Sequence, residues 1–374
     1  MDGGQIWNLL SDGGLSFTWG NALMISVGLV LIYLAIAKEY EPVLLLPIGF
    51  GCILANLGMA ASADGEGFLS ILYRAGIKSE LFPLLIFIGV GGMIDFSPLL
   101  AQPHLSLLGA AGQFGIYGTL LLATLIGFDI NEAASIGVIG AIDGPTAIYV
   151  AGRLAPELLA PIAVAAYSYM SLVPIIQPPV MKLLTTRKER LIRMDYAPKP
   201  VSKKARIIFP IAVTVVISLM APTAAPLIAA LMLGNLLKES GVVDRLNQSA
   251  QNEIINIATL FLGLTIGATM TAESFLQLDT LFILALGLLA FILDTAAGVL
   301  FGKLMSVISG GKINPLIGAC GISAFPMAGR LSAKMAQDED FENFILMHAM
   351  GSNTAGQLGS VIAGGLLLTL VIAL

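Results

Sequence analysis

The chain has 374 residues, of which 57% are hydrophobic and only 11% are charged, and its formal net charge is −5. Soluble globular domains carry about a quarter of their residues as charged side chains, so this composition, with a mean hydropathy of +0.90, excludes a soluble globular protein. The small, dispersed net charge gives no indication of a nucleic-acid partner.

Apolar segments follow one another along the chain from residue 21 onward. The residues before them include Asp2 and Asp12 but no Lys or Arg, so we expect no cleaved signal peptide. Several of the apolar runs approach the roughly 20 residues that a membrane-crossing helix needs. In chain order the segments are 21–37, 43–58, 81–95, 105–127, 133–150, 156–181, 207–220, 222–237, 254–270, 279–301, 313–330 and 342–373. They predict an all-α polytopic membrane protein with about 10–12 transmembrane segments.

One long polar stretch interrupts this pattern at the middle of the chain. Residues 182–206, "KLLTTRKERLIRMDYAPKPVSKKAR", carry nine Lys or Arg against two acids. The positive-inside rule therefore predicts a basic cytoplasmic loop. It divides the chain into a first transmembrane half, 1–181, and a second half, 207–374.

The two halves share a motif. "IGVIGAIDGPTAIYVAGRLAP" at 136–156 matches "IGACGISAFPMAGRLSAK" at 317–334, with the same Gly, Gly and Pro spacing followed by Gly-Arg-Leu. Apolar segments broken by Gly and Pro at matching places in two repeats indicate a transporter binding site. An even number of crossings per half would leave the halves parallel and an odd number would invert one of them. We expect inversion, because a broken segment need not cross the membrane fully.

Asp143 lies inside the first broken segment, in "GAIDGPTAIYV". An ionisable group in a membrane segment costs at least about 2.5–3.5 kcal/mol and indicates function. Backbone carbonyls freed around Gly144 and Pro145, together with the Thr146 hydroxyl, are hard oxygen donors that suit a small alkali cation. The alternative is a loop carboxylate at the membrane edge.

Other polar residues each allow a functional and a structural interpretation. Ser323 and Asn314, in and before the second break, are candidate cation ligands or interhelical hydrogen-bonding groups. Arg153 and Arg330 follow the breaks at matching places, where arginine either snorkels to the interface or binds an anion. Tyr167 and Tyr169 fit an aromatic belt or a buried phenol with a partner. The last segment, "MHAMGSNTAGQLGS" at 347–360, places Asn353, Gln357 and Ser360 in a hydrophobic run, and the structural alternative is helix packing through its glycines. Asp294 is a second buried-looking carboxylate and has no assigned partner.

Five stretches carry a resemblance to a known family: "LLLPIGFG", "GAIDGPTAIY", "AAYSYMSLVPIIQPP", "KINPLIGACGISAFPMAGR" and "LMHAMGSNTAGQLGSVIAGG". From about residue 20 the chain resembles the β subunit of the sodium-pumping, biotin-dependent decarboxylases, which act on oxaloacetate, methylmalonyl-CoA or glutaconyl-CoA. The resemblance implies that Asp143, Asn314, Gly318, Ser323 and Asn353 bind Na⁺. It also implies that Arg330 and Tyr169 serve the reaction.

The chain departs from the family pattern at three places. It reads "GSNTAG" where many members read "GPNVAG", so Ser352 and Thr354 put a backbone break near Asn353 in doubt. Asp294 occupies a position where an uncharged residue is expected. The short polar linker at 59–80 is closer to the CoA-ester decarboxylases than to the oxaloacetate enzymes.

The resemblance implies a membrane subunit that decarboxylates carboxybiotin held on a partner, consumes a proton and exports Na⁺. The expected partners are a biotin-carrier subunit, a carboxyltransferase subunit and a small membrane subunit, in an oligomeric complex in a bacterial or archaeal cell membrane. Biotin is not expected on this chain itself. The alternative function is a sodium-coupled carrier for an organic acid; the absence of a Walker loop disfavours an ATP-driven pump.

Overall fold

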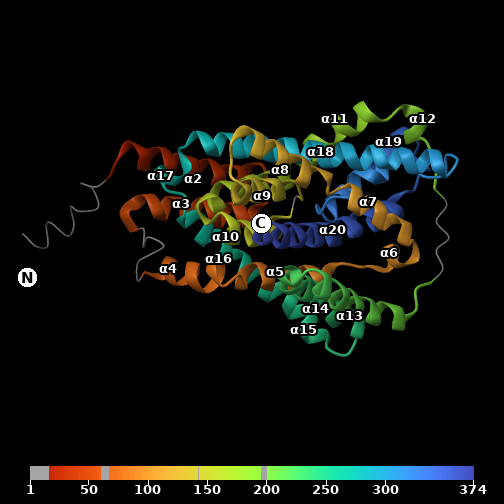
Figure 1. The fold of residues 1–374 in the computed structure, drawn as a ribbon, viewed down its shortest axis with the longest axis horizontal. Helices are drawn as coiled ribbons and strands as arrows, with labels where there is room; N and C mark the ends of the chain where they lie inside the picture. The colour runs from red at the N-terminus through yellow and green to blue at the C-terminus, as the bar shows by residue number, and fades with distance from the viewer. Residues whose placement is uncertain (1–16, 60–66, 142, 195–199) are drawn as a thin grey trace, which may run out of the picture.

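The computed structural model describes residues 17–59, 67–141, 143–194 and 200–374 (Figure 1). The first sixteen residues, on which the expectation about a signal peptide rests, lie outside the described residues, as does part of the 59–80 linker. Every regular element in the described ranges is helical, so the all-α prediction is confirmed.

The helices fall on either side of the basic loop. Before it come α2 Trp19–Ala37, α3 Pro42–Leu54, α4 Phe68–Leu72, α5 Leu81–Met93, α6 Ser97–Ala101, α7 Ser106–Ala111, α8 Phe114–Ile126, α9 Ile130–Gly137, α10 Gly144–Leu154 and α11 Leu159–Leu184. The short α12, Arg187–Arg190, lies within the loop. After it come α13 Lys203–Met220, α14 Ala225–Ser240, α15 Asp244–Ser249, α16 Ile255–Ala268, α17 Ala272–Phe275, α18 Leu278–Ile308, α19 Met327–Glu339 and α20 Leu346–Ala373. Helix α13 thus begins inside the range predicted as loop.

Five stretches of helix in the described residues are long and apolar enough to cross a membrane: 19–37, 103–126, 156–184, 278–308 and 346–373. A sixth crossing is possible if 68–78 and 81–93, which meet at a bend of 60°, form one span. The other predicted segments are shorter helices or helices interrupted by Gly and Pro. A polytopic membrane protein is therefore confirmed. The described residues contain fewer membrane-spanning helices than the 10–12 predicted, because the remaining apolar segments form helices of 18 residues or fewer.

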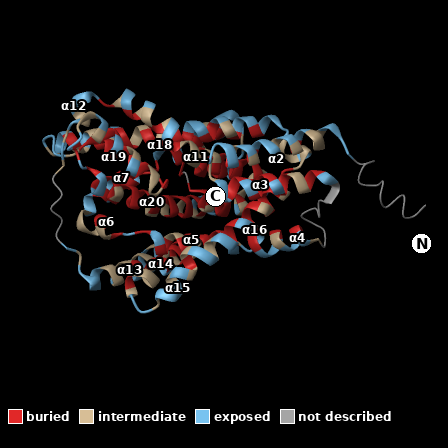
Figure 2. Cartoon of the chain, turned by 180° about the vertical axis from the view of Figure 1, so that it is seen from behind, coloured by how far each residue is buried: buried red, intermediate tan, exposed pale blue. Residues whose placement is uncertain are grey.

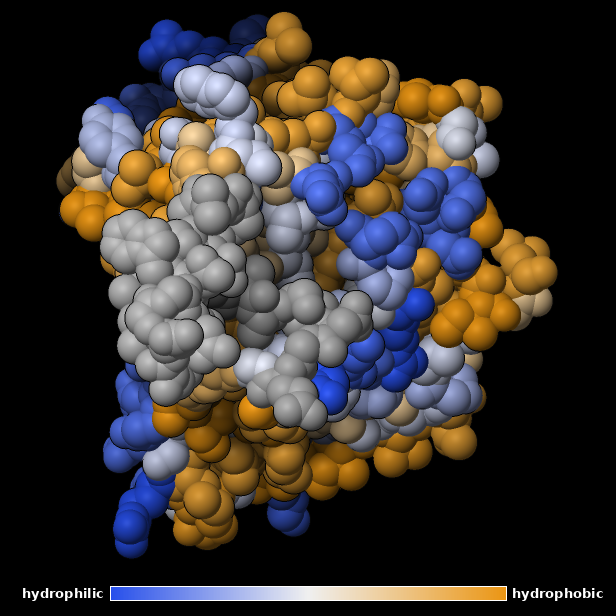
Figure 3. Space-filling model, turned by 90° about the vertical axis from the view of Figure 1, so that its left-hand side faces the viewer, coloured by the Kyte–Doolittle hydropathy of each residue, from blue (hydrophilic) through white to orange (hydrophobic). Residues whose placement is uncertain are grey.

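The long helices α11, α18 and α20 run along the long axis of the molecule (Figure 1). The short α12 of the basic loop lies at one end of this axis, and the N-terminal end of α2 lies toward the other. Buried residues fill the interior between the helices, and exposed residues line the outside (Figure 2). Seen from the end at which α2 begins, hydrophilic residues gather on the end face and hydrophobic residues form much of the rim (Figure 3). This distribution suits a protein whose sides face lipid.

Glycines bring two helix pairs into backbone contact. A Cβ on Gly267 of α16 would lie 2.0 Å from the Ile48 carbonyl oxygen of α3, and a Cβ on Gly234 of α14 would lie 1.9 Å from the Ile88 oxygen of α5. Small residues at such crossings are typical of membrane helices. Each pair is thus locked by a glycine that no larger residue can replace.

The same two pairs share a side-chain hydrogen bond. The Asn56 amide, at the end of α3, donates to the Met270 carbonyl after α16 over 2.8 Å. The Asn235 amide of α14 donates to the Ile94 carbonyl after α5 over 3.1 Å. Each pair joins a helix of the first half to a helix of the second, and the likeness of the two contacts accords with a duplicated chain. The inverted orientation of the halves stays a prediction.

Acidic residues of the second half hold the basic loop. Arg190 and Arg187 reach Glu339 at 2.7 and 3.2 Å, and Arg193 reaches Asp340 at 2.7 Å. These guanidinium groups keep the pKa of the Glu339 and Asp340 carboxyls below their usual range. The amides of Asn314 and Asn343 also donate to the Arg190 and Ile192 carbonyls. The loop is therefore docked onto the ends of α18 and α19.

We expect Gly234→Ala to lower the unfolding temperature of the purified protein, because the added methyl would meet the Ile88 carbonyl and overpacking costs about 1–3 kcal/mol. Gly152→Ala is the matched control, since a Cβ there meets nothing within 4 Å. Thermal unfolding in detergent measures both. Equal stability of the two variants would contradict the close packing of α5 and α14.

Acid is expected to release the basic loop. Because the folded pKa of Glu339 and Asp340 is lowered, the docking is complete above the ordinary carboxyl pKa of about 4 and is lost as the pH falls through the lowered values. Hydrogen exchange of the loop amides, corrected for intrinsic rates, measures this release. Glu339→Gln should raise exchange already at neutral pH, whereas Asp338→Asn should not.

Candidate cation site

Asp143 is the N-cap of α10, the helix that follows the first break. The sequence Asp-Gly-Pro-Thr favours this position, since aspartate accepts from the free amides of a first helical turn and proline fits there. The Thr146 amide lies 3.4 Å from Oδ1, and the Thr146 hydroxyl donates to Oδ2 over 2.7 Å. The carboxylate is 5% exposed, so it is an interior group and not a loop carboxylate at the membrane edge.

Helix α20 completes the surroundings of the carboxylate. The Gln357 amide and the Ser360 hydroxyl each donate to Oδ2 over 3.2 Å. A Cβ on Gly364, one turn after Ser360, would lie 2.6 Å from the Thr146 methyl, so this glycine lets α10 approach α20. Within 347–360, a Cβ on Gly356 would lie 2.5 Å from the Gly321 carbonyl carbon, so this glycine packs α20 on the second break. Two polar residues of the same stretch bind Asp143.

The two breaks meet at Asp143. The Ser323 amide of the second break donates to the Ala141 carbonyl of the first over 3.2 Å. The Ser323 hydroxyl donates to the Gly356 carbonyl over 3.4 Å. The pairing of the two breaks, expected from their matching motifs, is therefore present in the backbone itself.

Three side-chain amides bind the carbonyls of the second break. Gln113 donates to Gly321 over 2.9 Å and Gln177 to Ala319 over 2.9 Å, while Asn353 donates to Cys320 and Ile322 over 3.2 and 2.8 Å. The side-chain oxygen of each of these three amides is buried without a hydrogen-bond partner in the described part of the chain. Helix α20 runs unbroken through Asn353. The sequence "GSNTAG" therefore forms continuous helix, without a local backbone break.

Two predicted ligands have other contacts. Asn314 uses its amide on the basic loop, and its oxygen accepts from the Leu316 amide over 3.0 Å. Gly318 packs against α18, where a Cβ would lie 2.0 Å from the Gly298 oxygen. Neither is hydrogen-bonded to the Asp143 group, and their role as sodium ligands stays a prediction.

The two arginines differ in their environment. Arg153 forms a bidentate ion pair with Glu80 and lies 4.8 Å above the Tyr149 ring. Arg330 lies exposed at the start of α19, and within the described ranges no ion pair neutralises it. Arg330 is therefore the arginine available to an anion.

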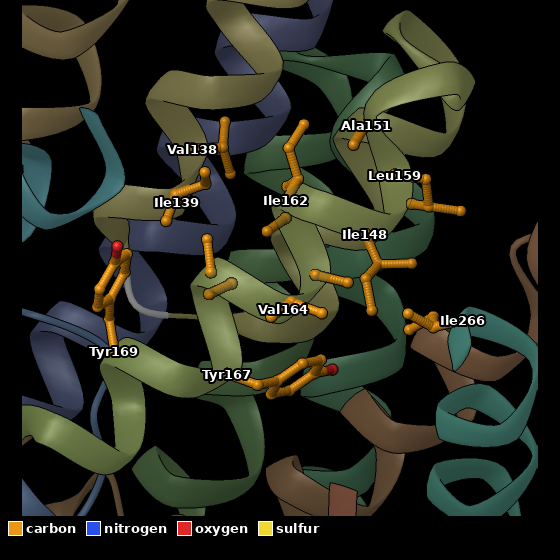
Figure 4. Packing of buried hydrophobic residues seen from close by; sticks show 14 of the residues in the cluster. Val138, Ile139, Ile148, Ala151, Leu159, Ile162, Val164, Tyr167, Tyr169 and Ile266 are labelled. Atoms are coloured by element: carbon orange, nitrogen blue, oxygen red, sulfur yellow. The ribbon is translucent and has the colours of Figure 1, made fainter. Parts of the chain in front are cut away.

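The two tyrosines of α11 point to different sides of the helix (Figure 4). The Tyr169 hydroxyl donates to the Leu284 carbonyl of α18. The Tyr167 ring packs on Gly144, the residue after Asp143, where a Cβ would lie 2.0 Å from the ring. Its hydroxyl has no hydrogen-bond partner in the described residues. Tyr167, which the resemblance did not single out, is thus the tyrosine beside Asp143.

The chemistry of the site fits a small alkali cation. One carboxylate, the hydroxyls of Thr146 and Ser360 and amide oxygens are hard ligands. The oxygen of Asn353, whose amide binds the second break, is buried and has no partner in the described residues. No group of three or more His, Cys, Asp or Glu side chains that could hold a metal is present in the described residues. The fold and this site define a polytopic membrane protein with a buried anionic site where two broken segments meet.

Comparisons with known proteins identify the family. Residues 20–371 match the family described as "Na+-transporting oxaloacetate decarboxylase beta subunit". The chain is 54% identical to the methylmalonyl-CoA decarboxylase subunit beta of Veillonella parvula, over 98% of this chain and 97% of that protein. It is 54% identical to the glutaconyl-CoA decarboxylase subunit beta of Acidaminococcus fermentans, over 97% of each. It is 49% identical to the oxaloacetate decarboxylase beta chain of Klebsiella pneumoniae, over 95% and 96%.

The chain belongs to the family of β subunits of the Na⁺-transporting decarboxylases. This confirms the predicted family and the predicted function as the membrane subunit of a sodium-transporting decarboxylase. It also makes the chain one member of a multi-subunit decarboxylase complex, inserted in a membrane by several helices.

Sodium is expected to raise the unfolding temperature of the wild-type protein in detergent more than potassium does. A ligand present at 100 times its Kd stabilises the folded state by about 2.7 kcal/mol. Asp143→Asn should abolish the difference between the two ions, because it removes the charge and keeps the shape. Asp279→Asn, an exposed acid on α18, is the control. A sodium effect that survives Asp143→Asn would place the ion elsewhere.

Proposed function

We propose that this subunit decarboxylates carboxybiotin carried by a partner subunit and uses the reaction to export Na⁺ bound at Asp143. The observation that supports this most is the Asp143 group itself, a buried carboxylate ringed by Thr146, Gln357 and Ser360 where the two breaks meet. Ser323 and Asn353 are the further proposed ligands, together with Asn314 and Gly318 from the second break.

Arg330 is proposed to bind the carboxylate of the substrate. Next along α19, a cleft of about 420 Å³ lies between α11, α12 and α19, lined by Lys182, Arg190 and Lys334 as well as by Asp338 and Glu339. Arg190 is paired with Glu339, so Lys182 and Lys334 are the cations proposed to attract an anionic group from the cytoplasm. In the reaction the bond between the carboxyl carbon and the ring nitrogen breaks, its electron pair stays on nitrogen, and nitrogen takes up a proton as carbon dioxide leaves.

Loss of the anion would couple the reaction to sodium. While the carboxylate is bound, its negative charge favours a cation in the low-dielectric interior. Departure of neutral carbon dioxide leaves the negative charge on the ring nitrogen, and protonation of that nitrogen then removes it. The free energy of the bound Na⁺ rises at this point, which favours its release outward. Moving one charge against 100 mV requires about 2.3 kcal/mol, so the pump needs such a chemical step. Tyr169 is proposed to serve this step, as the resemblance implies.

The partners and location follow from the same proposal. A biotin-carrier subunit, a carboxyltransferase subunit and a small membrane subunit would complete an oligomeric complex in the bacterial or archaeal cell membrane. We propose a CoA ester as the acid that feeds it. The alignments with the two CoA-ester relatives span 367 and 365 positions, against 416 for the Klebsiella oxaloacetate protein, which accords with the short linker of this chain.

The test supplies carboxybiotin to the purified complex and follows its decay in sodium and in potassium. We expect sodium to accelerate the decay at least about tenfold, which corresponds to about 1.4 kcal/mol in the activation free energy. Asp143→Asn should remove this acceleration. Asp279→Asn is the control for a general effect of charge. Equal decay in both ions would contradict the coupling. Absence of decay together with sodium-dependent uptake of an organic acid into liposomes would instead identify a carrier.

A further inference from the structure

Asp294 is a second carboxyl group in the core, and the site described above does not use it. It lies in the middle of α18 and is 0% exposed. Its Oδ1 accepts a hydrogen bond from the Gly115 amide near the start of α8. Its Oδ2 has no hydrogen-bond partner in the residues that the structure describes.

Two glycines form a cradle for this carboxyl. A Cβ on Gly115 would lie 2.6 Å from Oδ1, and a Cβ on Gly140 would lie 2.8 Å from Oδ2. Gly140 belongs to the 3₁₀ turn Val138–Ala141 that leads into the first break. The free oxygen of Asp294 therefore lies against the backbone of the segment that carries Asp143.

In the described residues no Lys, Arg or His side chain forms a hydrogen bond or ion pair with Asp294. The titratable groups on the elements around it are Tyr117 on α8, Glu132 on α9, Tyr167, Tyr169 and Lys182 on α11, and Cys320 at the second break. Tyr117 lines an outward-facing apolar groove, Glu132 caps α9, and Lys182 lines the cleft by the basic loop. Tyr167 lies against Gly144, Tyr169 bonds to Leu284 and the Cys320 thiol to Ser332.

A buried carboxylate without a countercharge costs several kcal/mol, so this group needs a bound cation of some kind. Asp143 has three side chains with oxygen atoms around it, as a metal ion requires. Asp294 has one backbone amide, which is a donor, and two glycines that leave little space. A proton, which needs only the one free oxygen, fits this cradle and a hydrated metal ion does not.

Polar groups lead from α18 to the second break. The hydroxyl of Thr295, the residue after Asp294, lies 3.4 Å from the Gln177 amide nitrogen. The same nitrogen donates to the Ala319 carbonyl over 2.9 Å. The Gln177 oxygen is buried and has no partner among the described residues. These groups extend from the neighbourhood of Asp294 toward the segment that precedes Arg330.

We propose that Asp294 is a proton-binding site of this subunit that releases and regains one proton in each reaction cycle. This inference rests on the proposed function, because decarboxylation leaves an electron pair on the ring nitrogen that must take up a proton. The O–H bond of the Asp294 carboxyl breaks, the proton moves toward that nitrogen, and Asp294 takes up another proton from water. While protonated, the carboxyl places a neutral group beside Gly140; once ionised, it places a negative charge there.

Infrared spectroscopy of the purified complex tests the bound proton without relying on activity. We expect the carbonyl-stretch band of a protonated carboxylic acid, sensitive to deuteration, in the wild type at neutral pH and its loss in Asp294→Asn. The asparagine keeps the acceptor for the Gly115 amide, so the fold is preserved. Replacing potassium by sodium should leave the band unchanged. If the band persists in Asp294→Asn, or if sodium removes it from the wild type, Asp294 does not carry a proton at neutral pH.

Turnover tests the role of that proton. Asp294→Asn should slow sodium-stimulated decarboxylation about a hundredfold, within the range for loss of a general acid, while sodium still raises its unfolding temperature. Asp279→Asn on the same helix should react at the wild-type rate. A wild-type rate and pH profile in Asp294→Asn would overturn the proposal. If sodium neither stabilises nor stimulates the wild type, the proposed function fails, and the infrared band still reports on Asp294.

Discussion

Unpaired backbone groups are the constraint on which this structure depends. A helix that stops inside a membrane leaves amides and carbonyls that cannot turn to water. At the second break the solution is three side-chain amides, from Gln113, Gln177 and Asn353, which bind four consecutive carbonyls from Ala319 to Ile322. These amides come from three different spanning stretches, so the break is held by the whole bundle and not by its own sequence.

At the first break a charged side chain, the Asp143 carboxylate, accepts from the unpaired backbone amide. Asp143 accepts from the free amide of Thr146 and from side chains of α20, and the Ala141 carbonyl is taken by the Ser323 amide. Two segments with a shared Gly and Pro pattern therefore differ in kind. One is neutral and fixed by amides, whereas the other has a carboxylate at its helix start and a second carboxyl, Asp294, beside Gly140.

The sequence predicted the elements that local chemistry determines. The two breaks follow from glycine and proline, and Asp143 stands out because a carboxylate is rare in hydrocarbon. The partners of Asp143 were harder to predict, since Gln357 and Ser360 lie 214 and 217 residues away and helix packing sets their register. Their spacing of three residues, which places both on one face of a helix, was the signal available.

For residues with two possible orientations, the sequence alone does not predict which neighbours the side chain contacts. Tyr167 and Tyr169 are two positions apart, so they lie on different faces of α11, and nothing local shows which face meets the first break. Asn314 lies beside a break in sequence, yet its amide binds the loop of the other half. Both outcomes depend on contacts between halves. Motif matching can locate a ligand-bearing segment, but the direction of each side chain comes from the partner helix.

Helix α18 connects the features that set the charge of the core. Its Gly298 lets the second break approach, its Thr295 meets Gln177, and its Asp294 faces the first break. This helix of 31 residues contacts both breaks and joins them through one continuous element. Arg153 is neutralised by Glu80, so in the described part of the core it is Asp143 and Asp294 that have no cationic partner of their own. Because Asp143 and Asp294 both adjoin the first break, a cation bound at either carboxyl would alter the free energy of the same segment. Through this shared segment, ion binding at one carboxyl and proton binding at the other can depend on one another.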